Sequence, residues 1–249
     1  RTPLSGHLNA VTAVAFADAG KTVLSAGQDG RLLRWDAATG KARGPAPALA
    51  RPGYYGALIP AALSPDGGRA FVAMIPVAVF DPATGQERFA LPTPPAPGGV
   101  NAQVFPSADG AKAAVVYTSY DRQKPPRAVV WDVAGGTKLG DVELPAGQPG
   151  YNPTAAVSPD GTRLLACTPA AQNVGGRGNG PGVVLTGYEV ATGKRLGELT
   201  VPGGYGAGLA AAADATTAVV SVPDGRLLVV DYAAGKQLAE VDPTAAAPG

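Results

Sequence analysis

A pair of residues, the first aromatic or β-branched and the second an acid, recurs five times along this chain and is followed each time by a turn. The acids stand at positions 36, 81, 132, 189 and 231, so successive copies lie 42 to 57 residues apart. A period near 45 residues is typical of repeat architectures, in which each unit stacks on its neighbours to bury a core. The sequence therefore predicts one stack of five similar units. The five pairs are Trp35–Asp36, Phe80–Asp81, Trp131–Asp132, Tyr188–Glu189 and Val230–Asp231.

Each repeat divides into four short apolar runs, which we call strands a to d in chain order. In the first repeat the runs are Val11–Phe16, Lys21–Ala26, Arg31–Trp35 and a shorter run from Lys41. Asp-Gly and Thr-Gly turns between such runs are typical of antiparallel hairpins. The turn between strands a and b is Ser-Pro-Asp-Gly or a variant of it in three later repeats, where Pro and Gly favour a tight turn. The pattern predicts an all-β fold.

Composition excludes several classes of protein. Hydrophobic residues make up 45% of the 249 residues, enough for a full core, and the 35 Gly and 25 Pro lie between the apolar runs. The net charge is +1 and the 20 basic residues form no run, so we expect no nucleic-acid partner. No stretch has the ~20 apolar residues that span a bilayer, so we expect no membrane span. The single Cys167 rules out an intrachain disulfide and fits the cytoplasm as well as a secreted or periplasmic location.

This plan resembles the WD-repeat β-propeller family, in a form with degenerate repeats as in bacterial members. The resemblance implies Gly-His before strand a, Ser or Thr in strand b, Asp in the b–c turn and Trp at the end of strand c. In that family these side chains form a hydrogen-bonded structural tetrad. The first repeat supplies His7, Ser25, Asp29 and Trp35, whereas the other repeats retain only parts of the set.

The resemblance implies a β-propeller of five four-stranded antiparallel blades in a single domain, 1–241. A closed five-blade ring is favoured, and part of a larger, seven-blade ring is the alternative. We expect 242–249 to be a tail, and a segment to precede Arg1 because the sequence lacks an initial Met. The expected repeats are 4–46, 53–92, 98–145, 150–201 and 204–241.

Catalytic and metal chemistry find little support in these residues. His7 and Cys167 are the only histidine and cysteine, too few for a zinc site, so we expect no metal and no cofactor. Ser25 lies in mid-strand without a Gly-x-Ser-x-Gly elbow, and the Gly-rich stretch 175–180 lacks the Gly-Lys-Ser/Thr ending of a phosphate loop. We therefore expect no enzyme. A carbohydrate-active five-blade hydrolase is an alternative that would require paired carboxylates, for which Asp121, Asp141 and Glu143 lack evident partners.

The loops differ between the two rims of the predicted ring. The b–c loops lengthen in the third and fourth repeats, at 119–127 and 168–182, and tyrosines follow Pro-Gly in the d–a loops. In a propeller these two kinds of loop share one rim, the top rim, and insertions on one face of a repeat array mark its working face. We therefore expect a protein- or peptide-binding scaffold, monomeric if the ring is closed. A structural module that completes its ring with another chain is a further alternative. The expected binding residues are Tyr54, Tyr55, Tyr120, Arg122, Lys124, Arg127, Tyr151, Arg177 and Tyr205.

Overall fold

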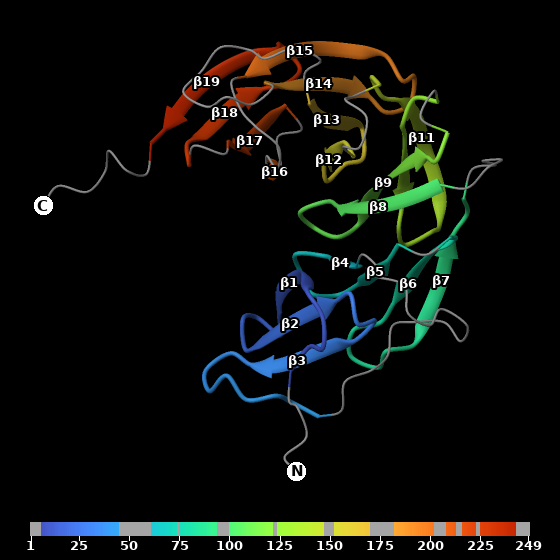
Figure 1. Ribbon diagram of the computed structural model, residues 1–249, viewed down its shortest axis with the longest axis vertical. Coiled ribbons are helices and arrows are strands. Elements are labelled where there is room, and N and C mark those ends of the chain that lie inside the picture. Colours follow the sequence, from blue (N-terminus) through green and yellow to red (C-terminus); the bar gives the residue numbers. More distant parts are fainter. Residues whose placement is uncertain are drawn as a thin grey trace, which may run out of the picture.

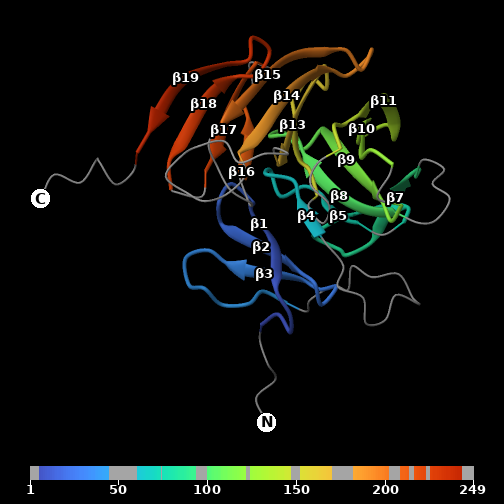
Figure 2. The ribbon, with the colours of Figure 1, turned by 45° about the horizontal axis from the view of Figure 1, so that its top comes forward.

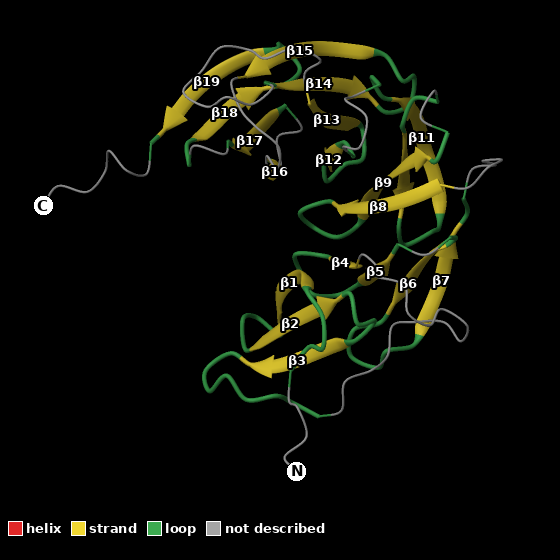
Figure 3. Ribbon diagram, viewed as in Figure 1, coloured by secondary structure: helices red, strands yellow, loops and turns green. Residues whose placement is uncertain are grey.

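The computed structural model is built from antiparallel sheets that follow one another around an arc (Figure 1). The described residues, which form nineteen strands, are 6–44, 61–73, 75–93, 100–121, 124–146, 152–169, 182–201, 208–212, 216–222 and 225–242. Within these ranges there is no helix (Figure 3), and hence none that could cross a membrane. The prediction of an all-β fold is confirmed.

Each sheet is one blade, with its strands in chain order. Blade 1 contains β1 (Val11–Ala17), β2 (Thr22–Gly27) and β3 (Leu32–Asp36). Blade 2 contains β4 (Ala61–Leu63), β5 (Ala70–Val72), β6 (Val77–Phe80) and β7 (Glu87–Leu91). Blade 3 contains β8 (Val100–Pro106), β9 (Lys112–Ser119), β10 (Arg127–Asp132) and β11 (Thr137–Glu143). Blade 4 contains β12 (Thr154–Val157), β13 (Arg163–Pro169), β14 (Val183–Glu189) and β15 (Arg195–Val201), and blade 5 contains β16 (Gly208–Ala211), β17 (Thr217–Ser221), β18 (Leu227–Asp231) and β19 (Lys236–Val241).

These five blades make the fold a five-blade β-propeller, as predicted. Blade 1 differs in its outer strand, which among the described residues is represented by Ala42, in a single bridge with Trp35. The expected tail begins at Asp242, and the rest of it lies outside the described residues.

A bulge recurs between strands c and d of blades 2 to 5. In each case the register shifts immediately before the residue that precedes the acid, at Phe80, Trp131, Tyr188 and Val230. Because the shift falls at the same place, the four blades can be aligned position by position. Blade 1 is aligned with them through Trp35, which also precedes the acid at the end of strand c.

The core consists of apolar clusters between adjacent blades. Phe80 packs on blade 1, Trp131 on blade 2, Tyr188 on blade 3 and Val230 on blade 4, and all four are buried. The residue before the acid therefore faces the preceding blade and supplies much of the apolar area buried there. We call this side of a blade its leading face and the opposite side its trailing face.

Blades 1 and 5 are the two ends of the arc. The described residues form four apolar clusters, at the interfaces of blades 1 and 2, 2 and 3, 3 and 4, and 4 and 5. None of these clusters joins blade 5 to blade 1, and Figure 1 shows β19 and β3 at opposite ends of the arc. Among the described residues, the leading face of blade 1 and the trailing face of blade 5 thus lack the apolar neighbour that the other blades have.

Candidate functional site

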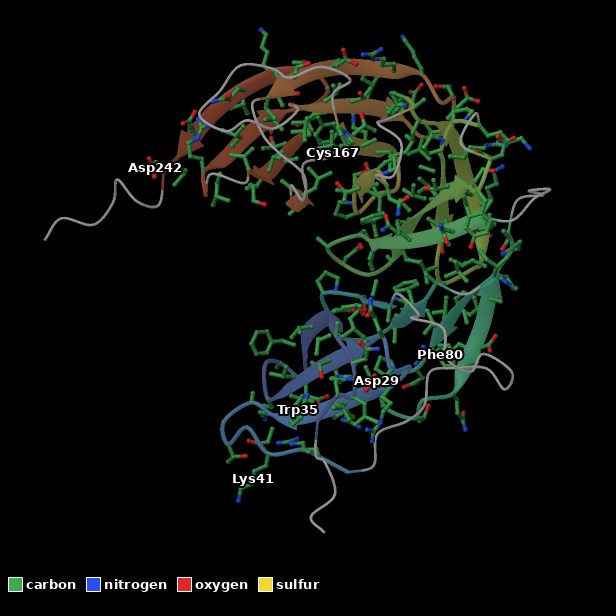
Figure 4. All side chains as sticks on the ribbon, viewed as in Figure 1. Asp29, Trp35, Lys41, Phe80, Cys167 and Asp242 are labelled. Atoms are coloured by element: carbon green, nitrogen blue, oxygen red, sulfur yellow. The ribbon has the colours of Figure 1, made fainter. Side chains whose placement is uncertain are left out.

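The tetrad residues of blade 1 are joined by direct hydrogen bonds. His7 Nδ1 lies 3.0 Å from Asp29 Oδ1, and His7 Nε2 lies 2.9 Å from Ser25 Oγ. Trp35 Nε1 donates to the same Ser25 Oγ at 2.8 Å. His7 Nε2 also lies 3.1 Å from the Ser25 carbonyl oxygen, so the ring is held between the Asp29 carboxylate on one side and two Ser25 oxygens on the other. Figure 4 shows Asp29 and Trp35 on this blade.

Asp29 also binds main-chain groups of the segment before β1 and of the b–c turn. Its carboxylate accepts from the N–H of Leu8 at 2.8 Å and from the N–H of Arg31 at 3.1 Å. Burial alone would raise the pKa of Asp29, but the hydrogen bonds from Leu8, His7 and Arg31 outweigh it and hold the pKa below its usual value. The ionised carboxylate therefore links the segment before β1 to the b–c turn of blade 1.

The distances within Ser25, His7 and Asp29 match those of a catalytic triad, but their surroundings do not favour catalysis. The Ser25 hydroxyl already accepts from Trp35, and Ser25 is only 6% exposed. A nucleophile must reach its substrate, and a satisfied buried network instead fixes local structure. We infer that the tetrad is structural.

We expect Asp29→Asn to destabilise the fold by about 1–3 kcal/mol at pH 7, because the new amide cannot accept from all three of its donors. The free energy of unfolding of the unchanged protein should also fall as the pH is lowered below about 4. The sign follows from the lowered pKa of Asp29: its contribution is present above the unfolded pKa and is lost as protons bind to the folded form. Urea unfolding at pH 7 and at pH 3 measures both effects, and the variant should show the weaker pH dependence. An equal loss in both proteins would assign the acid sensitivity to other carboxylates.

A cavity of about 370 Å³ lies where the first strands of several blades begin. Thr12, Ala61 and Thr154 stand at the starts of β1, β4 and β12, and Gln28 and Ala73 directly follow β2 and β5. Strand a begins, and strand b ends, at the rim that carries the d–a and b–c loops. The cavity thus lies among the inner strands of blades 1 to 4, and these five lining residues lie toward the top rim, the face on which the sequence predicts binding.

The polar groups of this cavity are amides and hydroxyls. Gln103, on β8, has a buried Oε1 that finds no hydrogen-bond partner among the described residues. Thr12 Oγ1 donates to Ala26 O at 3.3 Å. The described lining includes no carboxylate, so the cavity offers no support for the paired carboxylates of a glycoside hydrolase.

Three of the expected binding residues can be placed. Tyr120 is 62% exposed, directly after β9, and its hydroxyl lies 3.1 Å from Asn101 Oδ1. Lys124 Nζ lies 3.8 Å from Asp121. Arg127 was expected in the b–c loop but is the first residue of β10, where cross-strand pairing with Tyr117 and Glu143 extends the strand. The other expected residues, Tyr54, Tyr55, Arg122, Tyr151, Arg177 and Tyr205, lie outside the described residues.

The expectation that Asp121 and Asp141 lack partners is wrong: Lys124 lies beside Asp121, and two basic residues contact Asp141. Arg127 donates to both of its oxygens, at 3.1 and 2.8 Å, and Lys138 Nζ lies 2.9 Å from Oδ2. This cluster joins β10 to β11 at the outside of blade 3, where long cationic side chains lie across the pleat from an acid. Arg127 is thus engaged within its own blade, which leaves Tyr120 and Lys124 as the described candidates on the rim.

Sequence reasoning missed the polar residues of the cavity. Thr12, Gln103 and Thr154 lie within or at the start of apolar strands a, where a polar side chain interrupts the pattern. That interruption is the signal that could have identified them, since a polar residue on an inner strand must face either a partner or a cavity.

Other reactive groups are not arranged for chemistry in the part of the chain that the structure describes. No three His, Cys, Asp or Glu residues there lie close enough to hold a metal ion. Burial raises the pKa of the Cys167 thiol to about 11, which keeps it protonated and poorly nucleophilic at neutral pH.

Comparison with known proteins agrees with this architecture. The family model for the WD domain, G-beta repeat, matches residues 1–36, which cover the tetrad and end with β3. The β-propeller domain of Cps50 (Swd1) from Myceliophteria thermophila, solved by crystallography, is similar over 96% of this chain and 75% of its own, with a TM-score of 0.59 and 16% identity. No curated protein sequence matches the chain.

The class of protein is therefore a β-propeller. Its first blade carries a WD40 repeat, and the two comparisons support the predicted resemblance to the WD-repeat propellers.

Proposed function

We propose that this propeller is a non-enzymatic scaffold that binds a protein or peptide partner at its top rim. WD40 propellers are typically protein-interaction scaffolds, and the WD40 repeat match of the first blade and the propeller fold support the proposal. Fold alone does not specify a site. The rim itself therefore has to support the proposal.

The observation that carries the proposal is the cavity at the rim end of the inner strands. The side chains of Gln28, Gln103 and Thr154 line it with amide and hydroxyl groups, which can form hydrogen bonds with the main chain of a peptide. Tyr120 stands exposed on the same rim, with a rigid ring and a hydroxyl of the kind enriched at interfaces. Together these groups fit a neutral, extended peptide segment better than a charged ligand.

The double variant Tyr120→Ala/Gln103→Leu tests the proposal. Quantitative affinity purification should recover the partners of the unchanged protein with at least a tenfold loss in this variant. Stability should be retained, because Tyr120 is exposed and Leu replaces an unpartnered polar group of similar size.

Lys194→Ala is the matched control, since Lys194 is exposed in the c–d turn of blade 4, on the opposite rim. It should capture partners as the unchanged protein does. Undiminished capture by the double variant would contradict binding at the top rim, and loss in the control alone would move the site to the other face.

A further inference from the structure

The polar residues of the cavity lie at one level of the inner strands. Gln103 and Thr154 occupy the same position of strand a in blades 3 and 4, as their pairing with strand b shows. Thr12 lies in the bulge of β1, one residue before the equivalent position of blade 1, and Gln28 directly follows β2. We call these four residues the polar band of the cavity.

The next residues along the inner strands are apolar. Val104 and Phe105 directly follow Gln103 on β8, and Ala61 and Ala62 hold the corresponding positions of β4. Strands β1, β4 and β8 lie next to one another on the inside of the arc (Figure 2). Because strand a runs away from the top rim, these four residues lie farther from that rim than the polar band. We call them the apolar floor.

The room in the cavity suits a single side chain. Its volume of about 370 Å³ is near the lower end of the range for ligand pockets, about 300–1,000 Å³. On blade 2 the lining consists of Ala61, Ala62 and Ala73, whose methyl side chains leave space open. Phe105 of blade 3 bounds the same space with a ring that is partly exposed.

Charged groups near the rim give a charged partner segment little to pair with. The described lining of the cavity contains no Asp, Glu, Lys or Arg. Several basic residues of the rim already lie beside acids of this chain, which matches their charge. These pairs are Lys124 with Asp121, Arg127 with Asp141 and Arg226 with Glu240.

Exposed apolar residues occur in the b–c loops of the same two blades that form the floor. Ile75 is 38% exposed and follows Ala73, a lining residue, by two positions. Tyr120 is 62% exposed and belongs to blade 3, as do Gln103 and Phe105. A segment that enters the cavity can therefore make apolar contacts on the rim as well.

We propose that the partner inserts one aliphatic side chain, of the size of valine to methionine, onto the apolar floor, while its main chain bonds to the polar band. This inference rests on the function proposed above and adds the chemistry of the anchor. An ionised side chain would lose hydration there without an opposite charge, and an amide or hydroxyl would be left unpaired on the floor. An aliphatic side chain has neither cost and buries apolar area.

Selection of a phage-displayed library of random dodecapeptides on the full chain supplies the probe. The enriched peptides should share one aliphatic residue. A synthetic copy of the strongest binder, labelled for fluorescence anisotropy, should lose about tenfold in affinity when alanine replaces that residue. Glutamate at the same place should cost more, because its charge would be buried without a partner.

Two variants of the protein change the size of the floor in opposite directions. Ala61→Leu fills part of it and should weaken the strongest binder about tenfold, while the alanine peptide loses much less. Phe105→Leu enlarges it and should shift the preference of the cavity toward a larger anchor, phenylalanine. A purely structural role of either residue would lower all affinities together, and circular dichroism shows whether each variant keeps its fold.

Lys194→Ala, on the opposite rim, is the control and should bind every peptide as the unchanged protein does. The inference is overturned by enriched peptides without a shared aliphatic residue, by equal affinity of the aliphatic and alanine peptides, or by a preference that neither floor variant alters. If partner capture still depends on Tyr120 and Gln103 in any of these cases, the scaffold proposal stands and the aliphatic anchor alone is wrong.

Discussion

Phe71→Ala should destabilise the protein by about 3–5 kcal/mol, the usual cost of removing a buried aromatic side chain. Phe71, on β5, is completely buried and packs on the trailing face of blade 2, in the cluster shared with blade 3. Urea-induced unfolding followed by circular dichroism gives the change in the free energy of unfolding.

Phe16→Ala makes the same chemical change at a site that is 61% exposed. Its effect in dilute solution should be within about 0.5 kcal/mol. Comparable losses in the two variants would mean that Phe16 is buried in solution, and the exposed leading face of blade 1 would then be wrong.

Gly140→Ala should cost about 3 kcal/mol or more, at the upper end of what overpacking costs. A Cβ atom at Gly140, on β11, would lie 2.0 Å from the Val190 carbonyl oxygen and 2.7 Å from its carbonyl carbon. The obstacle is main chain in the c–d turn of blade 4, which cannot rotate away as a side chain could. Relief requires the two blades to separate, so the midpoint of thermal unfolding should fall markedly.

Gly6→Ala is the matched control, because a Cβ at Gly6 meets nothing within 4 Å. It should leave the melting midpoint nearly unchanged. A tolerated Gly140→Ala would show that blades 3 and 4 are packed less closely than the structure has them.

Much of the fold could be predicted from the sequence because the decisive signals are local. The turn at 158–163 is held by its own residues: Ser158 Oγ lies 2.6 Å from Asp160 Oδ1 and accepts from the Arg163 N–H at 3.0 Å. The residue before each acid is also a local signal, because a large aromatic residue at a strand end indicates packing in the core. Trp131 and Tyr188 are indeed both buried between blades.

The remaining features depend on contacts between distant residues. The position of Arg127 follows from pairing on both sides of β10, and its bond to Asp141 from the register of β11. The cavity at the rim requires inner strands of several blades to meet, which no single repeat encodes. The exposure of Phe16 could not be predicted either, because Phe16 stands at the end of an apolar strand a just as the buried Val157 does.

The recurring bulge between strands c and d has a consequence for how such a chain can change its length. Since the shift falls at one place in blades 2 to 5, each of these blades has the residue before the acid at the same point of strand c, where it packs on the preceding blade. A duplicated copy of residues 100–143 placed between two blades would meet both of them in a geometry that the protein already uses. A whole blade could therefore be gained or lost without a new type of inter-blade contact, because the bulge keeps the residue before the acid in the same position in each blade.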